Sequence, residues 1–256
     1  MSTHHDEMTF LEDKTRTYIT SKYSWDRTIK KYALDNFLPY MTRKGSALEF
    51  GCYDGYMTSH ISCHVQHLTV VEGSKTFIDM ARQVAPDNVT FIHSLFENYF
   101  PNTRFDYIFA TFVMEHVSDP IEFLKHAGNL LKGDGFLYLV VPNARSLSRQ
   151  LACHMGFLNE PFELTPNDLN HGHRRVYDRL TLNRDIASSG LQQVSQGGLM
   201  LKPFADFQMD LMIDNNILGE TQLEGLYQLG FLYPDFASSL FSVCKLPDSE
   251  DRGYHD

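Results

Sequence analysis

Residues 48–55 read Leu-Glu-Phe-Gly-Cys-Tyr-Asp-Gly and join a short apolar strand to a glycine turn. Gly51 and Gly55 permit a tight turn and the close approach of a ligand to the backbone. A helix is expected directly afterwards, from Tyr56 to about His64. A strand, a glycine turn and a helix in this order predict a loop of the kind that binds nucleotides.

The sequence beyond this turn alternates between apolar strands and amphipathic helices. After Asn143 the alternation stops for about 35 residues, and it resumes with a helix near 180–189. Alternating strands and helices predict a parallel sheet with helices on both faces. We therefore expect an α/β, doubly wound, seven-stranded and mostly parallel sheet whose last strand is antiparallel. The strands are expected at 47–50, 68–72, 89–93, 105–111, 135–142, 191–195 and 241–246, with further helices at about 75–85 and 120–131.

The domain organisation follows from the same pattern. Residues 1–44 are polar and aromatic and predict an N-terminal helical lid, and residues 45–198 form the core, with an insertion at about 143–176. A cap insertion is expected at 199–240, followed by the last strand and a polar tail at 241–256. An apolar stripe from Phe204 to Phe231 in the cap indicates a core or dimer contact, so a homodimer is one hypothesis.

The composition of the chain limits the classes of partner that it is expected to bind. The formal net charge of -10 disfavours binding to nucleic acid or to anionic membrane surfaces, which draws on clustered Lys and Arg. No apolar run approaches the roughly 20 residues of a membrane span, and the first residues lack the order of a signal peptide. Four cysteines without paired spacing suit a reducing compartment. We expect a cytoplasmic protein with a small-molecule partner.

An acidic residue ends the second expected strand. Glu72 lies 21 residues after Gly51, where a carboxylate can accept hydrogen bonds from both hydroxyls of a ribose. A nicotinamide-dependent dehydrogenase would share this pair of features. However, three residues separate Gly51 from Gly55, and Tyr53 stands where a middle glycine would be expected. An NAD-dependent oxidoreductase is therefore the second hypothesis.

Four segments carry a resemblance to a known family. They read L-E-F-G-C-Y-D-G at 48–55, V-V-E-G-S at 70–74, F-D-Y-I-F-A-T-F-V-M-E-H-V-S-D-P at 105–120 and L-L-K-G-D-G-F-L-Y-L-V-V-P-N at 130–143. In this order they resemble the class I S-adenosylmethionine-dependent methyltransferases, over about residues 45–195, and specifically the branch similar to ubiquinone-biosynthesis O-methyltransferases. The resemblance implies a Rossmann-like fold and methyl transfer to an oxygen, less often a nitrogen, of a small molecule. A sugar, a sugar nucleotide or a natural-product intermediate would be typical.

The resemblance also implies where S-adenosylmethionine would bind. The glycine turn would pass under the methionyl part, Glu72 would hold the ribose, the turn at 94–96 would flank the adenine, and Thr111 and Phe112 would close over the sulfonium side. Tyr53 and Ser94 depart from the family pattern. The complete expected set is Glu49, Gly51, Cys52, Tyr53, Gly55, Glu72, Gly73, Ser74, Ser94, Leu95, Phe96, Thr111 and Phe112, with Tyr18 and Tyr23 from the lid.

Methyl transfer is an in-line displacement, so the protein must align the acceptor and, for a hydroxyl, remove its proton. Glu115 and His116 follow the fourth strand, where some relatives with an E-x-x-E-H signature hold a divalent metal. Phe112 replaces the first acid of that signature, so no metal is expected. His116 is a candidate base, since imidazole titrates near neutral pH, or it fixes the loop by hydrogen bonding. Glu115 is a catalytic candidate with the same alternative.

A second cluster, His-Gly-His-Arg-Arg-Val-Tyr, occupies residues 171–177 of the insertion. His171 and His173 are further catalytic candidates, and the alternative is that His173 anchors the following helix. Basic and hydroxyl side chains there could bind an anionic or polyhydroxylated acceptor. The expected acceptor-binding residues are Arg174, Arg175, Tyr177 and Asn143. Because Tyr53 and Phe112 depart from the family pattern, an inactive cofactor-binding partner subunit is the third hypothesis.

Overall fold

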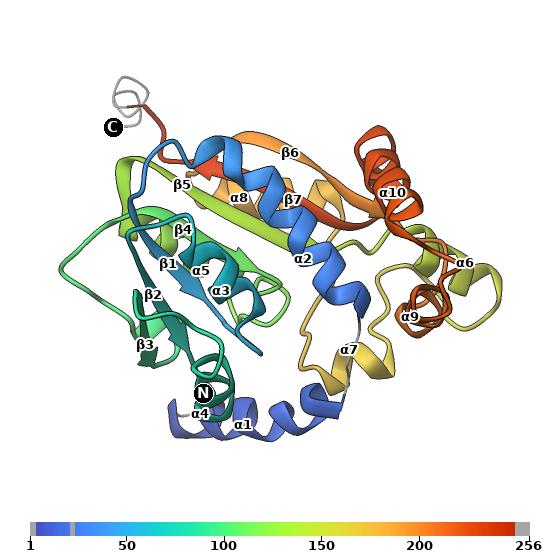
Figure 1. Cartoon of the computed structure of the whole chain (residues 1–256), viewed down its shortest axis with the longest axis horizontal. Coiled ribbons are helices and arrows are strands. Elements are labelled where there is room, and N and C mark those ends of the chain that lie inside the picture. Colours follow the sequence, from blue (N-terminus) through green and yellow to red (C-terminus); the bar gives the residue numbers. More distant parts are fainter. Residues whose placement is uncertain (1–3, 21–23, 249–256) are drawn as a thin grey trace.

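The computed structural model describes residues 4–20 and 24–248, with side chains for residues 6–15 and 25–248. The described residues form a seven-stranded sheet in the order β3-β2-β1-β4-β5-β7-β6 (Figure 1). This architecture confirms the predicted α/β fold. The strands are β1 (Ser46–Phe50), β2 (His67–Glu72), β3 (Val89–His93), β4 (Phe105–Thr111), β5 (Leu131–Pro142), β6 (Gln192–Leu201) and β7 (Ala237–Lys245).

The first five strands are all parallel, because each is joined to the next by a connection that crosses over the sheet. β7 lies antiparallel between β5 and β6, as expected for the last strand. β6 extends further than the predicted 191–195, because its pairing with β7 continues to Leu201.

Helices cover both faces of the sheet (Figure 1). One apolar core packs α2, α3 and the C-terminal helices against the sheet, with Trp25, Phe37 and Tyr138 among its largest buried side chains. The opposite core packs α5 and α8 through residues such as Leu124 and Ile186. The helices are α1 (His4–Thr20), α2 (Ser24–Phe37), α3 (Tyr56–Ser62), α4 (Lys75–Ala81), α5 (Pro120–Leu130), α6 (Leu147–His154), α7 (Pro166–Asn170), α8 (Arg179–Ser188), α9 (Asp206–Asp214) and α10 (Glu220–Leu232), with short 3-10 turns η1 (Leu38–Tyr40), η2 (Phe96–Asn98) and η3 (Pro234–Phe236).

Strand order reverses between β1 and β4, which pair directly with Leu48 opposite Ile108. β1 leads onward to β2 on one side, whereas β4 leads to β5 on the other. The loops that leave the carboxyl ends of β1 and β4 therefore diverge and open a crevice between them. The candidate functional site lies at this crevice.

Candidate functional site

The turn after β1 has the backbone conformation that its glycines predict. Gly51, Tyr53 and Gly55 have φ values of 76°, 46° and 79°, all in the left-handed region. A Cβ atom on Gly55 would lie 2.7 Å from the Cα atom of Ala81 in α4. Gly55 thus satisfies two constraints at once, the left-handed turn that starts α3 and the close packing of that turn on α4.

Two buried carboxylates flank this turn. Glu72, at the end of β2, accepts hydrogen bonds from the backbone N–H of Cys52 at 3.1 Å and of Ser74 at 2.8 Å. Burial raises the pKa of Glu72, and these N–H donors oppose the increase. Glu49, in β1, accepts a hydrogen bond from the Thr58 hydroxyl at 2.6 Å, and burial raises its pKa to about 8. The carboxylates fix the shape of the loop and line the crevice beside it.

A cavity of about 380 Å³ occupies the crevice. That volume is within the range of small-molecule sites. One side is formed by predicted cofactor residues, namely Glu49, Gly51, Cys52, Tyr53, Glu72, Ser74, Phe96, Thr111 and Phe112. The other side carries Glu115, His116, Asn143, His171 and His173. Among the described residues, Gly55, Gly73, Ser94 and Leu95 lie outside this lining, so the predicted adenine turn contributes only Phe96 to it.

The end of β4 bends sharply into the cavity. Phe112 has a φ of 57°, an uncommon conformation for a residue with a side chain, and its N–H donates to the carbonyl of Val140 in β5 at 2.9 Å. The hydroxyl of Thr111 is buried and makes no hydrogen bond with the described residues. Strained backbone and unsatisfied polar groups gather where a ligand is bound.

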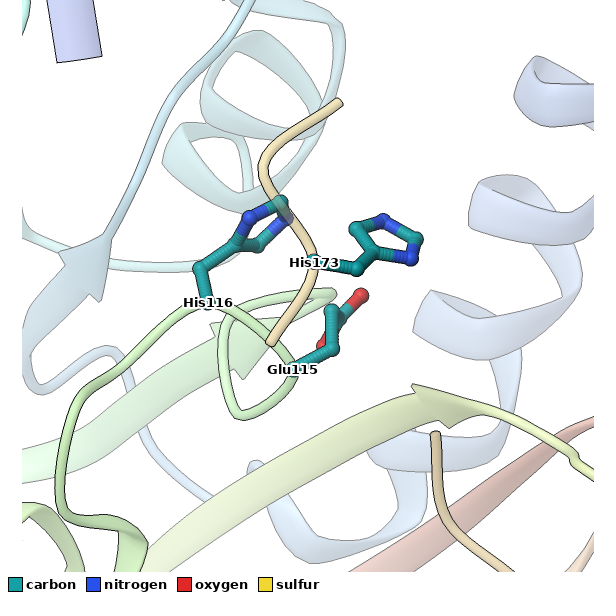
Figure 2. Close-up of side chains that lie close together, drawn as sticks. All are labelled: Glu115, His116 and His173. Carbon is teal, nitrogen blue, oxygen red and sulfur yellow. The ribbon is translucent and has the colours of Figure 1, made fainter. Parts of the chain in front are cut away.

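Three proton-accepting side chains meet on the far side of this bend, and we call Glu115, His116 and His173 the Glu-His-His cluster. Figure 2 shows Glu115 and His116 on the loop after β4 and His173 on the adjacent segment of the insertion. One ligand atom from each residue lies within 4.8 Å of those of the other two. The His116 and His173 ring centroids are 4.8 Å apart. The structure therefore brings together three of the four predicted catalytic residues.

The Glu115 carboxylate is fully buried, and within the described residues neither of its oxygens has a hydrogen-bond partner. Burial raises the pKa of Glu115 to about 7, while nearby His173 opposes the increase. Removal from water lowers the pKa of the His116 imidazole to about 3, so His116 is neutral at physiological pH. His171, the fourth catalytic candidate, lines the same cavity with its ring centroid 6.3 Å from that of His173.

Asp168 holds His173 in place, and the sequence did not reveal this partner. The Nδ1 atom of His173 lies 3.0 Å from a carboxylate oxygen of Asp168, whose other oxygen pairs with Arg149 at 3.1 Å. The same carboxylate takes part in a capping box with Thr165 at the start of α7. The T-P-N-D motif is typical of such a box and was the available signal. Its proximity to His173 depends on how the insertion folds back.

The predicted acceptor-binding residues play structural roles here. The Arg175 guanidinium donates to the carbonyls of Met114, Val117 and Ser118 and so fixes the loop after β4. The Arg174 guanidinium donates to the carbonyl of His116. Neither arginine lines the cavity. Tyr177 lies in the core and donates to Asp185, and of this group only Asn143 reaches the cavity, with its amide donating to the carbonyls of Asp235 and Ala237.

Helix α1 runs from α4 toward α7 (Figure 1), and its residues Glu7, Phe10, Leu11 and Lys14 line the cavity. At the cofactor side, the Glu12 carboxylate accepts hydrogen bonds from the hydroxyls of Ser74 and Thr76 at the start of α4. At the acceptor side, Lys14 donates to the carbonyl of Leu169 in α7 at 2.8 Å, and Glu7 pairs with Arg174. The side chain of Tyr18 and all of Tyr23, which were predicted to contact the cofactor, lie outside the described residues.

The strand order, the glycine turn and the acid that ends β2 define the class of protein, a Rossmann-like methyltransferase fold. Residues 22–196 match a family model described as a methyltransferase domain, and the chain belongs to that family. The predicted resemblance to class I S-adenosylmethionine-dependent methyltransferases is thereby confirmed.

The relatives are distant. A probable S-adenosylmethionine-dependent methyltransferase of Mycobacterium tuberculosis is 26% identical over 61% of this chain and 52% of its own length. The chain thus spans about half of that relative. A ubiquinone biosynthesis O-methyltransferase of Vibrio cholerae is 24% identical over 69% of this chain and 73% of its own length.

Solved structures support the fold. The N-methyltransferase NodS of Bradyrhizobium japonicum, in complex with S-adenosylhomocysteine, has a TM-score of 0.58 at 13% identity and covers 97% of this chain and 100% of its own. The DhpI complex with the same compound has a TM-score of 0.61 at 15% identity and covers 96% of this chain and 98% of its own.

In the part of the chain that the structure describes, no helix combines the length and apolar character needed to cross a bilayer.

Proposed function

We propose that this chain transfers the methyl group of S-adenosylmethionine to an oxygen of a small polar molecule, such as a sugar, a sugar nucleotide or a natural-product intermediate. The observation that carries the proposal is the continuity of one cavity. It joins the glycine turn and Glu72 to the Glu-His-His cluster, with the end of β4 between them. The cofactor and the acceptor would occupy its two halves.

The cofactor half suits S-adenosylmethionine in shape and charge. Gly51 lets a ligand approach the backbone, and a Cβ atom there would lie 4.0 Å from a Glu72 carboxylate oxygen. Glu72 would receive the ribose hydroxyls, and Ser74 and Phe96 line the same half. A positive sulfonium bound beside Glu49 and Glu72 would favour the ionised forms of these carboxylates, which burial alone disfavours.

The acceptor half suits a nucleophile that must lose a proton. In the reaction a C–O bond forms as the C–S bond of the sulfonium breaks, and the hydroxyl proton leaves the acceptor. Glu115, His116 and His173 are proton acceptors that lie within 4.8 Å of one another. We assign all three the task of orienting the acceptor hydroxyl. Glu115 and His173 would draw away its proton, because the low pKa of His116 makes that imidazole a weak base.

Replacement of His173 by alanine tests this role. Turnover should fall by about 10²-fold or more, because the imidazole that contacts the acceptor is lost, while the affinity for S-adenosylhomocysteine stays the same. His116→Ala should behave similarly. Release of S-adenosylhomocysteine across a panel of sugars, sugar nucleotides and aromatic intermediates measures turnover, and calorimetry measures affinity. Unchanged turnover in both variants would return the two histidines to the loop-fixing role.

The other hypotheses predict different ligands and products. For an NAD-dependent oxidoreductase, a nicotinamide cofactor rather than S-adenosylhomocysteine would raise the melting temperature. The methyltransferase family match favours the opposite result. For an inactive partner subunit, S-adenosylhomocysteine would bind but no acceptor would be methylated. A thermal-shift panel followed by the acceptor panel separates the three hypotheses.

A further inference from the structure

We infer that the Glu-His-His cluster is a binding site for one divalent transition-metal ion, with open coordination positions that face the cavity. Two imidazoles and one carboxylate are a donor set that Fe²⁺, Mn²⁺, Co²⁺ and Zn²⁺ accept, whereas Mg²⁺ and Ca²⁺ favour oxygen ligands. The metal's part in methyl transfer rests on the proposed function, but its binding does not.

The geometry is close to that of a formed site. The three ligand atoms lie within 4.8 Å of one another. At metal–ligand bonds of about 2.1 Å, neighbouring ligand atoms are about 3.0 to 3.5 Å apart. Bringing the ligand atoms from their present separation to that of a formed site takes movements of about 1 Å, which rotations of the side chains can supply. Figure 2 shows the three side chains converging from two separate segments.

Glu115 supplies the negative charge that such a site needs. Its carboxylate is fully buried and both oxygens lack a hydrogen-bond partner among the described residues. A buried carboxylate without a partner is costly, and a bound cation would offset that cost. The other acids on this side of the cavity are already paired, Asp168 with Arg149 and Asp206 with Lys202.

The histidines are held as metal-binding histidines usually are. The Nδ1–H of His173 donates to Asp168, which leaves Nε2 with the lone pair that binds a metal. His116 is hydrogen-bonded to the backbone of Gly172. Metal-bound histidines commonly donate their second ring nitrogen to a carboxylate or a backbone carbonyl, which fixes the tautomer and the ring orientation.

The inferred site differs from the expectation of no metal, which nothing in the structure tests directly. That expectation rested on Phe112, which stands where the related signature has its first acid. In this structure the third donor comes from the insertion instead, because His173 reaches the cluster from the segment after α7. With a metal bound, the three side chains would act as its ligands rather than as bases. An acceptor oxygen at an open position would then lose its proton more readily, since a metal lowers the pKa of a coordinated hydroxyl.

Metal binding is tested on the full-length chain after chelator treatment and dialysis. Calorimetric titration with MnCl₂, and visible absorption on addition of CoCl₂, measure stoichiometry and affinity. We expect one equivalent to bind, and Glu115→Gln and His173→Asn each to weaken binding by 10-fold or more. His64→Asn is the matched control, because His64 is exposed and distant in sequence from the cluster. It should bind metal as the parent chain does.

The sequence holds 12 histidines, so binding elsewhere on the chain must be recognised. The double variant Glu115→Gln/His173→Asn gives this background. Binding of equal strength and stoichiometry in the parent chain and the double variant would overturn the inference, as would no binding to the parent chain. Titration of every sample with S-adenosylhomocysteine reports correct folding. Failure of that titration in the parent chain would count against the proposed function and leave the metal site standing.

Discussion

At the scale of single residues, Asp168 shows how one carboxylate serves both a helix cap and the candidate site. It closes the capping box of α7 with Thr165 and also orients the His173 imidazole. Removal of the Thr165 hydroxyl breaks the cap and takes one hydrogen bond from the Asp168 carboxylate, but it leaves the contact between Asp168 and His173 in place. The cap contributes about 1 kcal/mol to stability, whereas the contact with His173 acts on the site.

Asp168→Asn should lower turnover by about 10-fold, because the uncharged amide holds the imidazole less firmly. Affinity for S-adenosylhomocysteine should not change. Steady-state kinetics on Asp168→Asn beside Thr165→Ala provide the comparison. Equal kinetics in the two variants would mean that Asp168 acts only through α7.

Gly55→Ala tests the packing of the turn after β1. The added Cβ atom meets the α4 backbone at 2.7 Å in a left-handed conformation, so we expect a loss of about 3 kcal/mol in the free energy of unfolding. Gly156→Ala is the control, because Gly156 has a similar φ of 76° and nothing within 4 Å of its added Cβ atom. It should lose about 1 kcal/mol. Urea unfolding measures both, and similar losses would exclude a role for close packing.

At the scale of elements, α1 makes polar contacts with the rest of the chain at both sides of the cavity, beside the packing of Phe10 and Leu11. Its Glu12 carboxylate joins the start of α4, and Lys14 joins α7. Burial raises the pKa of Glu12, but hydrogen bonds from Thr76 and Ser74 outweigh this effect and lower it below its usual value. Glu12 is therefore ionised, and a strong acceptor, throughout the neutral range.

Glu12→Gln should loosen α1 at the cofactor side, because an amide accepts weaker hydrogen bonds than a carboxylate. S-adenosylhomocysteine should dissociate about 10-fold faster, with little change in the free energy of unfolding. Asp13→Asn is the control, since Asp13 is exposed on the same helix. Stopped-flow displacement measures the rates. Identical rates for the two variants would show that this contact does not retain the cofactor.

At the scale of the whole molecule, stability against acid depends on a charged group at the amino end of the sheet. Asp106 is buried and accepts hydrogen bonds from Lys132, Arg43 and Ser46. Burial alone would raise the pKa of Asp106, but these donors hold it well below its usual range. The stabilisation is complete above about pH 4, the unfolded value, and is lost as the pH falls further.

Asp106→Asn should lower the free energy of unfolding by about 2 kcal/mol at pH 7, and the difference should shrink below pH 4. Asp134→Asn is the control, because Asp134 also pairs with Arg43 but its side chain is 66% exposed. It should change the free energy by less than about 0.5 kcal/mol. Urea unfolding at several pH values measures these free energies. A loss in the Asp106→Asn variant that does not vary with pH would contradict the stabilising role of the Asp106 charge.

The fold was predictable because its signals are local. Apolar runs, the Asp119 cap of α5 and the turn at Gly51 each act within a few residues, and they place the core strands within a few residues of their observed bounds. The site was only partly predictable. The positions of Glu115 and His116 follow from the end of β4, whereas the contact of Glu12 with α4 and that of His173 with His116 join segments far apart in the sequence, which no local pattern encodes.

The placement of α1 has a consequence for the order of events in catalysis. One helix touches both the cofactor side and the acceptor side of the cavity, so its detachment uncovers both halves together. Under the proposed function, S-adenosylhomocysteine and the methylated product would then share one exit. Product release, rather than methyl transfer, would then limit the rate of steady-state turnover. A rapid-quench experiment would record a burst of one methyl group transferred per chain before the linear phase.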